Sequence, residues 1–493
     1  MDVVLFNPVP RSGRQVHRRV ELPLGLLACA TPLDRRGYRV AIVDAFADPG
    51  WRQSLDRALA RRPICFGVTS MTGPQLLHAL EGCRIVRRRY PDLPIVWGGV
   101  HASLLPEQTL AHELVDVVVV GEGEETFPEL VAALRDGTPL EAVKGLCYRD
   151  AAGAARRTGE RPFVELDAHG QLAYHLVQVD RYRRQLFDID HLSLNTSRGC
   201  VHRCAFCWDP AMHRRRWRAM RPETIVCQLE RIRREHGVRG FLFTDDNFFV
   251  DPRRARAVLE TIVARGLDLT ISKLQVRVDE LCRMEPALLE LMVRAGVKRL
   301  TIGVESGSQR VLDLIGKGIT IEQAIEANRK LARYPIKPLY LFMMGLPTET
   351  AEDLGRTIRL AVQMTDENPR AVKSFNIYTP YPGTPLFDRC VELGLRPPER
   401  LEDWAAFNFR NVPERSWLSP RMGRLVSALD LPLMFIGKDT FVNATSYKRT
   451  NWLLLALAKL YYPIARYRVT HLEDRWPIES LVAKRLGLFA RQG

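Results

Sequence analysis

The stretch that decides the fold of this chain is Cys200-Val201-His202-Arg203-Cys204-Ala205-Phe206-Cys207. Its three thiols can wrap one compact metal centre, because thiolates ligate both zinc and iron–sulfur clusters. A zinc site usually joins two separated Cys pairs and no second pair occurs here, although His202 and His213 lie close enough in sequence to complete a Cys3His set. Three thiolates would leave one iron of a four-iron cluster open to a substrate or cofactor. The spacing favours a cluster and keeps zinc as the alternative.

This spacing, with Phe206 before the last cysteine, resembles the signature of the radical S-adenosylmethionine (radical SAM) enzymes. The resemblance implies that Cys200, Cys204 and Cys207 ligate a 4Fe-4S cluster and that Phe206 packs near the adenine of SAM. In that family the open iron is chelated by the amino and carboxylate groups of SAM. One-electron reduction of the sulfonium then yields a 5′-deoxyadenosyl radical.

The other seven cysteines stand singly, and we expect them to be small core residues. They are Cys29, Cys65, Cys83, Cys147, Cys227, Cys282 and Cys390. Ten cysteines in 493 residues are too few for a secreted disulfide scaffold, and Met1–Pro8 lacks the layout of a signal peptide. We therefore predict a cytoplasmic protein. The longest apolar run, 452–460, is shorter than the ~20 residues that cross a bilayer, so no transmembrane span is expected.

Around the cysteine motif, short apolar runs alternate with helical stretches from residue 191 onwards. The expected strands are 192–195, 240–244, 270–276, 299–304, 338–344 and 374–378. Such repeated strand–helix units predict a partial (β/α)6 barrel over residues 191–395, identified by the resemblance as the radical SAM barrel. In barrels of this kind the C-terminal ends of the strands form the working face.

The ends of three barrel strands carry polar residues that can bind SAM. Asp245 and Asp246 can meet an ammonium group, or they form a plain Asp-Asn turn. Arg277 can pair with the SAM carboxylate, or it makes an inward structural salt bridge. Glu305 or Ser306, in a stretch of small residues that resembles the family's fourth-strand motif, can reach a ribose hydroxyl.

A second α/β alternation occupies the first 140 residues and predicts an N-terminal doubly wound, Rossmann-like domain. Its expected strands are 3–6, 39–44, 63–70, 94–97 and 115–120. Residues 141–190 lose this periodicity and are expected to form a linker with short β elements. Residues 396–493 are expected to form a mainly helical C-terminal domain that caps the barrel or contacts the substrate.

The N-terminal domain has no G-x-G-x-x-G after its first strand, so a dinucleotide site is not expected. Small residues follow later strands instead, and this surface can hold a broad, flat cofactor and its tail. Ahead of a radical SAM barrel, the layout resembles the cobalamin-binding domain of the B12-dependent radical SAM family. The resemblance covers roughly residues 1–390. The cobalamin contacts it implies are Thr69, Ser70, Gly98, Gly99, His101, Gly121, Glu122 and Gly123.

The D-x-H-x-x-G signature, which supplies a lower axial histidine to cobalt in classical B12 enzymes, is absent. Many members of the resembled family also lack it, so its absence does not exclude cobalamin. For His101 itself, a hydrogen-bonded turn histidine is favoured over a cobalt ligand. A domain that keeps the shape without the cofactor stays an alternative.

Arginines crowd the cysteine motif in a chain whose 72 Lys and Arg against 57 Asp and Glu give a formal net charge of +15. They are Arg198, Arg203, Arg214, Arg215, Arg216, Arg218 and Arg221. Such a field can draw anionic substrates or nucleic acid. The favoured alternative is a solvated helix start facing Glu223 and Glu230. Since no RNA-binding appendage follows the barrel, no nucleic-acid partner is expected.

The segment 447–463 is strongly apolar, with basic and aromatic flanks. It can lie in a membrane interface and accept a lipid-like substrate, which would give peripheral membrane contact. The alternative is a core helix that closes the barrel mouth.

Together the resemblances imply a class B, cobalamin-dependent radical SAM methyltransferase. Its expected target is an unactivated carbon or phosphinate centre of a small-molecule or lipid-like biosynthetic intermediate, methylated through a 5′-deoxyadenosyl radical and methylcobalamin. An electron donor such as flavodoxin or ferredoxin is implied. The alternatives are an oxidative cyclase or rearrangement enzyme without methyl transfer and a non-catalytic cluster or zinc-binding module. The sequence identifies neither the substrate nor a catalytic residue.

Overall fold

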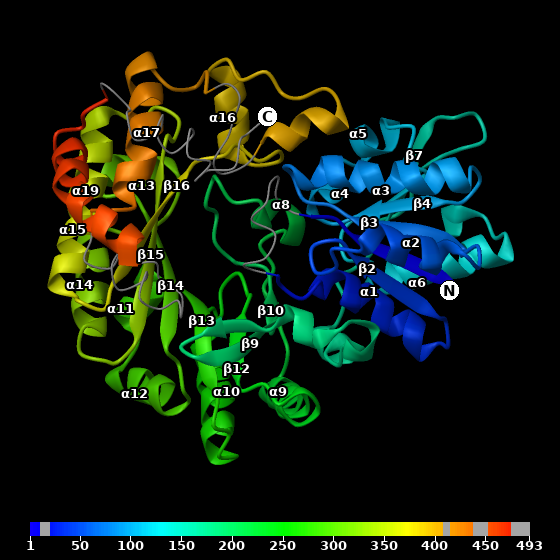
Figure 1. Ribbon diagram of the computed structural model, residues 1–493, viewed down its shortest axis with the longest axis horizontal. Helices are drawn as coiled ribbons and strands as arrows, with labels where there is room; N and C mark the ends of the chain where they lie inside the picture. The colour runs from blue at the N-terminus through cyan, green and yellow to red at the C-terminus, as the bar shows by residue number, and fades with distance from the viewer. Residues whose placement is uncertain (10–19, 408–414, 437–451, 475–493) are drawn as a thin grey trace.

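The computed structural model describes residues 1–9, 20–407, 415–436 and 452–474, with side chains omitted at 452–458. Two seven-stranded sheets organise these residues. In Figure 1 the blue and cyan N-terminal sheet lies to the right, and the green to yellow sheet curls on the left. The predicted fold class, a doubly wound domain followed by a partial barrel and a helical C-terminal part, is confirmed.

The N-terminal sheet has the strand order β2-β1-β3-β4-β5-β6-β7, and its first five strands run parallel. These strands are β1 Val3–Asn7, β2 Val40–Asp44, β3 Cys65–Thr69, β4 Ile95–Gly98 and β5 Val117–Val119. Their helices are α1 Leu24–Arg35, α2 Trp51–Leu59, α3 Gln75–Arg89, α4 Val100–Leu104, α5 Pro106–Ala111 and α6 Gly123–Asp136. The strands are nearly continuous apolar runs because helices cover both faces of the sheet. The order reverses between β1 and β3, and ligands of such folds bind at the strand ends there.

The predicted linker contributes strands to both sheets. An antiparallel hairpin of β6 Leu146–Arg149 and β7 Ala155–Arg157 extends the first sheet beyond β5. After α7 Leu166–His169 and short 3-10 turns, β8 Arg184–Leu186 pairs antiparallel with the first barrel strand. The hairpin covers an edge of the N-terminal sheet that would otherwise expose unpaired backbone groups.

The second sheet has the order β16-β15-β14-β13-β12-β9-β8. Six of its strands are parallel and follow the chain in sequence: β9 Ile189–Leu194, β12 Gly240–Phe243, β13 Thr270–Arg277, β14 Arg299–Glu305, β15 Lys337–Met344 and β16 Val372–Ile377. The helices between or after them are α9 Pro222–His236, α10 Pro252–Ala264, α11 Val278–Arg283, α12 Pro286–Arg294, α13 Gln309–Leu314, α14 Ile321–Leu331, α15 Ala351–Glu367 and α16 Pro385–Glu392. In this order β9 and β16 stand apart, so the barrel is open.

The C-terminal part of the chain contacts elements of both the N-terminal domain and the barrel. The 3-10 helix η4 Leu401–Ala406 packs on α3, and Trp404 Nε1 donates to Gln108 Oε1 at 2.6 Å. Helix α17 Pro420–Leu433 contacts β16, and α19 Trp452–Thr470 contacts α15 and α17. The side chain of Gln108 in turn donates to the carbonyl oxygen of Pro398 at 2.8 Å.

The apolar segment predicted at 447–463 falls partly outside the described residues. In the described half of α19, Ala465 and Val469 are buried against the neighbouring helices, whereas Leu460, Ile464 and Tyr467 are exposed. Within the described ranges, no helix is long and apolar enough to cross a membrane.

Most single cysteines lie in or beside the cores, as predicted. Cys65, Cys83, Cys147 and Cys390 are buried, while Cys29 and Cys282 are half-buried. The prediction was wrong for Cys227, which is exposed on α9. Cys227 lies near the Arg265 guanidinium, at 3.9 Å from Nη1, on the outward face of its helix.

Candidate functional site

A two-stranded ribbon closes the cysteine motif into a loop. Its strands are β10 Ser197–Arg198 and β11 Arg218–Ala219, which pair antiparallel, and the loop between them holds the cysteines and α8 Asp209–His213. Gly199 adopts a φ of +86°, and a Cβ there would lie 2.1 Å from the carbonyl oxygen of Arg216. Only glycine therefore lets the loop leave the ribbon at this point.

The three loop cysteines are half-buried free thiols. Burial raises the pKa of Cys200 to about 11 and that of Cys207 to about 12, so both stay protonated until a metal displaces the proton. The backbone N–H of Cys207 donates to the carbonyl of Cys204 at 3.1 Å, which folds the loop into a tight turn. Three thiols on one short loop are a donor set that fits an iron–sulfur cluster.

The two histidines of the zinc alternative lie beside carboxylates. His202 Nε2 is 3.7 Å from Glu280 Oε1, and His213 Nε2 is 3.9 Å from Asp209 Oδ1. Burial and the neighbouring Asp246 carboxyl raise the pKa of Asp209 to about 8. Ligand atoms of Asp209, His213 and Asp246 lie within 4.8 Å of one another, so at neutral pH this group keeps a proton next to the loop.

The two aspartates at the end of β12 have different surroundings. Asp245 is fully buried and accepts from Thr196 N at 2.7 Å, Thr196 Oγ1 at 2.5 Å and Ser197 Oγ at 2.7 Å. These bonds join β12 to the start of the ribbon. Asp246 is half-buried and accepts from Gly199 N at 3.2 Å. Of the two predicted SAM contacts, Asp246 is the one whose side chain retains some exposure.

Arg277 and Glu305, predicted from different strands, lie against the cysteine loop. Arg277 Nη1 donates to Cys204 Sγ at 3.7 Å, and its Nε donates to Asp279 Oδ1 at 2.9 Å, so it also forms the salt bridge of the structural alternative. Glu305 adopts a φ of +71°, and its Oε1 pairs with Lys317 Nζ at 2.9 Å. The Lys317 ammonium lies 5.8 Å from the Phe206 ring centroid, which connects Glu305 to the loop.

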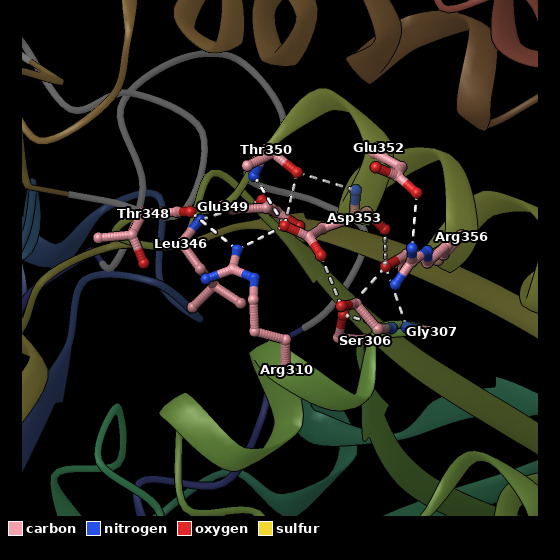
Figure 2. Close-up of polar contacts among 12 residues, drawn as sticks. Ser306, Gly307, Arg310, Leu346, Thr348, Glu349, Thr350, Glu352, Asp353 and Arg356 are labelled. Carbon is pink, nitrogen blue, oxygen red and sulfur yellow. Dashed lines mark hydrogen bonds and ion pairs between the residues drawn. The ribbon is translucent and has the colours of Figure 1, made fainter.

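Ser306 belongs to a buried polar network instead. Its hydroxyl lies 3.0 Å from Thr357 Oγ1, and Gly307 N donates to the same oxygen at 2.9 Å (Figure 2). Asp353, which accepts from Ser308 Oγ at 2.6 Å and pairs with Arg310, ties this turn to α15. Ser306 therefore stabilises the end of β14 through its contact with α15. No local sequence pattern indicates this role, because Thr357 is 51 residues away.

The same network contains the buried carboxyl Glu349. Its Oε2 accepts from Gly345 N at 2.6 Å and Leu346 N at 3.2 Å, which fixes the turn after β15 (Figure 2). Burial raises the pKa of Glu349 to about 8. Trp417 from the C-terminal part donates to the carbonyl of Gly345 at 2.9 Å, so this turn also anchors that part of the chain.

The predicted cobalamin residues at the ends of β3 and β4 pack against each other. Ser70 Oγ donates to the carbonyl of Gly98 at 2.9 Å. Gly99 has a φ of +93°, and a Cβ there would lie 2.5 Å from Ser70 O and 3.0 Å from Thr69 Oγ1. Small residues are needed here because the two strand ends meet backbone to backbone. This edge of the sheet, where β3 and β4 end, therefore carries two glycines and two hydroxyl residues in close contact.

His101 is fully buried beside this edge. Its Nδ1 lies 2.9 Å from Thr72 Oγ1, and the Trp404 ring packs edge-on at 5.8 Å. Burial lowers the pKa of His101 to about 4, so the imidazole is neutral. Its Nε2 is buried and has no partner among the residues that the structure describes. These contacts are those of the turn histidine favoured above.

The turn Gly121–Glu124 connects the two sheets. Glu122 Oε1 lies 3.1 Å from Arg198 Nη1 and 2.7 Å from Arg218 Nη2, and Glu124 pairs with Arg198 as well. Despite burial, Arg218 and Arg198 lower the pKa of Glu122 to about 2. Glu122 was predicted to contact cobalamin, but its carboxylate binds the two arginines of the ribbon. Gly121 has a φ of +84°, and open space surrounds the position of its missing Cβ; Gly123 begins α6 and contacts Cys29.

The preferred explanation of the arginine cluster was wrong for these two residues. Arg198 and Arg218 face Glu122 and Glu124, not the acidic residues of α9, and Glu230 pairs with Arg265. The partners lie 76 and 96 residues apart in sequence, so local charge patterning could not reveal them. Of the remaining arginines, Arg214 pairs with Glu160 and Arg221 with Asp167.

Comparisons with known proteins match both halves of this arrangement. Residues 194–361 match the model of the radical SAM superfamily, and residues 18–131 match that of the B12 binding domain. An uncharacterised methyltransferase of Pyrococcus horikoshii is 31% identical over 395 residues, which cover 79% of this chain and 83% of that protein. An anaerobic magnesium-protoporphyrin IX monomethyl ester cyclase of Cereibacter sphaeroides is 28% identical over 416 residues, covering 83% of this chain and 66% of the cyclase.

Among solved structures, the cobalamin-dependent SAM radical enzyme OxsB, with aqua-cobalamin and SAM bound, has a similar fold. The TM-score is 0.73 and the sequence identity 20%, and the match covers 99% of this chain and 75% of OxsB. The likeness therefore extends over both sheets and the C-terminal part.

Proposed function

Because the chain belongs to the B12-binding radical SAM enzymes, we propose that it is a cobalamin-dependent methyltransferase. Its target in this proposal is an unactivated carbon or a phosphinate centre of a small-molecule biosynthetic intermediate. The observation that carries the proposal is the contact between the cysteine loop and the Gly121–Glu124 turn, since it holds the cluster ligands against the cobalamin domain.

In this proposal different residues of the chain hold each of the three cofactors. Cys200, Cys204 and Cys207, which lie on one half-buried loop, would bind a 4Fe-4S cluster. When bound, the cluster would supply the electron that cleaves SAM to a radical able to abstract a hydrogen atom, and cobalamin would supply the methyl group. For cobalamin, the edge at Gly98 and Gly99 offers a surface for a broad ring.

Around SAM, Phe206, Asp246, Arg277 and Glu305 are the proposed contacts. Arg277 touches Cys204 and Glu305 is linked to Phe206 through Lys317, so both can meet a ligand held at the cluster. Asp245 and Ser306 support the site without contacting SAM in this proposal, since their polar atoms bind other parts of the chain. Burial and the neighbouring Asp246 raise the pKa of Asp209 to about 8, so Asp209 adds no negative charge beside the thiolates at neutral pH.

The wider setting is also proposed. We infer a small-molecule or lipid-like substrate, a flavodoxin or ferredoxin as electron donor, and a cytoplasmic location, with peripheral membrane contact through the exposed face of α19. The division into residues 1–140, 141–190, 191–395 and 396–493 stays a prediction, and the hairpin β6–β7 argues for moving the first boundary past residue 157.

A second candidate is an oxidative cyclase or rearrangement enzyme that transfers no methyl group. The cyclase relative at 28% identity favours it. The two functions differ in one product, because methyl transfer from SAM leaves S-adenosylhomocysteine and radical formation leaves 5′-deoxyadenosine.

The experiment that separates them is metal and product analysis of protein made without oxygen in cobalamin-fed cells. We expect about four irons and one cobalt per chain, and both S-adenosylhomocysteine and 5′-deoxyadenosine when substrate candidates are added. Iron with no cobalt, and 5′-deoxyadenosine alone, would replace the methyltransferase with the cyclase or rearrangement enzyme. Zinc in place of iron would leave only the metal-binding module.

A further inference from the structure

We propose that Glu122 and its partners Arg198 and Arg218 position the cysteine loop, so that the loop takes its working conformation only when the N-terminal domain is docked against it. The inference rests on the proposed function, because that function requires two cofactors to act on one substrate across this contact. Glu122 is a positioning residue in this view and touches neither cofactor.

The ribbon at the base of the loop carries a built-in repulsion. Arg198 and Arg218 are directly opposite each other in β10–β11, which has only two residue pairs. Like charges opposite each other destabilise a strand pair, and a two-stranded ribbon this short has little else to hold it. By itself, the ribbon would open.

Glu122 removes that repulsion from the other domain. Its Oε1 lies 3.1 Å from Arg198 Nη1 and 2.7 Å from Arg218 Nη2, and its Oε2 accepts from Arg218 Nη1 at 2.9 Å. One carboxylate thus bridges both strands, and Glu124 adds a second negative charge at Arg198. Two glutamates against two arginines leave the group neutral.

The dependence is mutual because the glutamates are buried. The side chains of Glu122 and Glu124 are only 8% and 3% exposed. A buried carboxylate without its partner is strongly destabilising, so the turn requires the ribbon as much as the ribbon requires the turn. Separating the two domains would therefore disturb both at once.

Residues of the predicted linker contact this group of two glutamates and two arginines, and a further contact of Arg218 connects the group to the cysteine loop. Val164 N donates to Glu122 Oε2 at 2.9 Å, and the Phe163 ring lies 4.3 Å from the Arg218 guanidinium. Arg218 Nη2 also lies 3.4 Å from His213 Nδ1, on the short helix that follows Cys207. A change at Glu122 thus reaches the loop through side chains in contact.

The first test is hydrogen exchange of the metal-free, full-length chain, comparing the wild type with Glu122→Gln and Glu129→Gln. Glu129 lies on the same helix, α6, and pairs with Arg161 away from the ribbon, so its variant makes an equal change of charge. We expect residues 197–219 to exchange at least about tenfold faster in Glu122→Gln and at the wild-type rate in Glu129→Gln.

Two further variants guard against simple loss of folding. Arg218→Lys keeps the charge but loses the two-pronged contact, and we expect a smaller acceleration in the same segment. The double variant Glu122→Gln/Arg218→Gln removes the like-charge pair from the ribbon while Arg198 keeps its pair with Glu124, and it is expected to return exchange toward the wild-type rate. Acceleration spread evenly over the whole chain in all three variants would overturn the inference, because the contact would then serve the fold in general.

The second test uses the reconstituted enzyme and measures 5′-deoxyadenosine formed per S-adenosylhomocysteine. In Glu122→Gln we expect this ratio to rise at least about fivefold with the KM for SAM unchanged. The bound cluster would hold the loop itself together, so radical formation continues, while the loop's placement against the N-terminal domain, which methyl transfer needs, is lost. An unchanged ratio together with unchanged exchange would overturn the inference. A wild type that forms no S-adenosylhomocysteine would overturn the methyltransferase proposal instead, while the exchange comparison would still decide the role of Glu122 in ordering the loop.

Discussion

The two sheets end in opposite ways at the candidate site. The barrel strands end in charged side chains that are held in ion pairs: Arg277 pairs with Asp279 and also contacts Cys204, and Glu305 pairs with Lys317. The N-terminal strands end in small residues such as Ser70 and Gly99, which pack backbone to backbone. The difference teaches that one half of the site is suited to grip a small polar ligand by charge. The other half is suited to receive a broad ligand by shape.

Removing a cluster ligand should break the barrel half completely. In Cys204→Ala we expect loss of most iron and of all 5′-deoxyadenosine formation, because two thiolates cannot hold the cluster. Iron analysis and product detection measure this. The control is Cys227→Ala, an exposed cysteine outside the loop, which should keep both. Full SAM cleavage in Cys204→Ala would mean that the cluster is held elsewhere.

Removing the buried carboxylate that joins β12 to the ribbon should weaken the barrel half without abolishing the fold. We expect Asp245→Ala to cost about 3 kcal/mol, since it leaves Thr196 N and two hydroxyls unpaired in the interior. Urea unfolding of the metal-free chain measures it. Asp268→Asn removes an exposed ion pair with Arg239 and should cost less than about 0.5 kcal/mol. Equal costs would show that burial does not distinguish them.

Adding a methyl group at Gly99 should disrupt the close packing of the strand ends in the N-terminal domain. Gly99→Ala places a Cβ 2.5 Å from Ser70 O at a φ of +93°, so we expect a loss of about 2 kcal/mol and of cobalamin binding. Gly37→Ala is the matched control, because its φ of +83° brings a similar backbone strain in open space and Gly37 is not a predicted cobalamin contact. It should cost about 1 kcal/mol. Cobalt content after reconstitution and thermal unfolding separate the two variants.

The buried carboxyl of the turn after β15 should make stability depend on pH. Burial raises the pKa of Glu349 to about 8, above its value in the unfolded chain, so the folded state binds the extra proton. Its contribution to stability is therefore complete at acid pH and is lost as the pH rises through about 8. We expect Glu349→Gln to lose less stability than the wild type between about pH 5 and pH 9. The slope of the urea midpoint against pH measures this, and parallel slopes would assign the pH dependence to other groups.

The sequence predicted the strands, the barrel and the cluster loop because each depends on local order. Strand runs such as 3–6 are apolar along their length, and the cysteines are neighbours in the chain. Asp245, Ser306 and Glu122 were placed on the ligand side because their position after a strand suggested it. Their actual partners, Thr196, Thr357 and Arg218, lie 49 to 96 residues away, and nothing local marks such pairs.

The contact of Trp404 with Gln108 and His101 has a consequence for how the chain is made. The two sides of the Trp404–Gln108 hydrogen bond are 296 residues apart, so the N-terminal domain leaves the ribosome with this surface uncovered. At about 5–20 residues per second, its cover follows roughly 15–60 s later. During that interval the surface around Gln108 and His101 is exposed to water. The nascent protein therefore has to be kept from aggregating until Trp404 covers this surface.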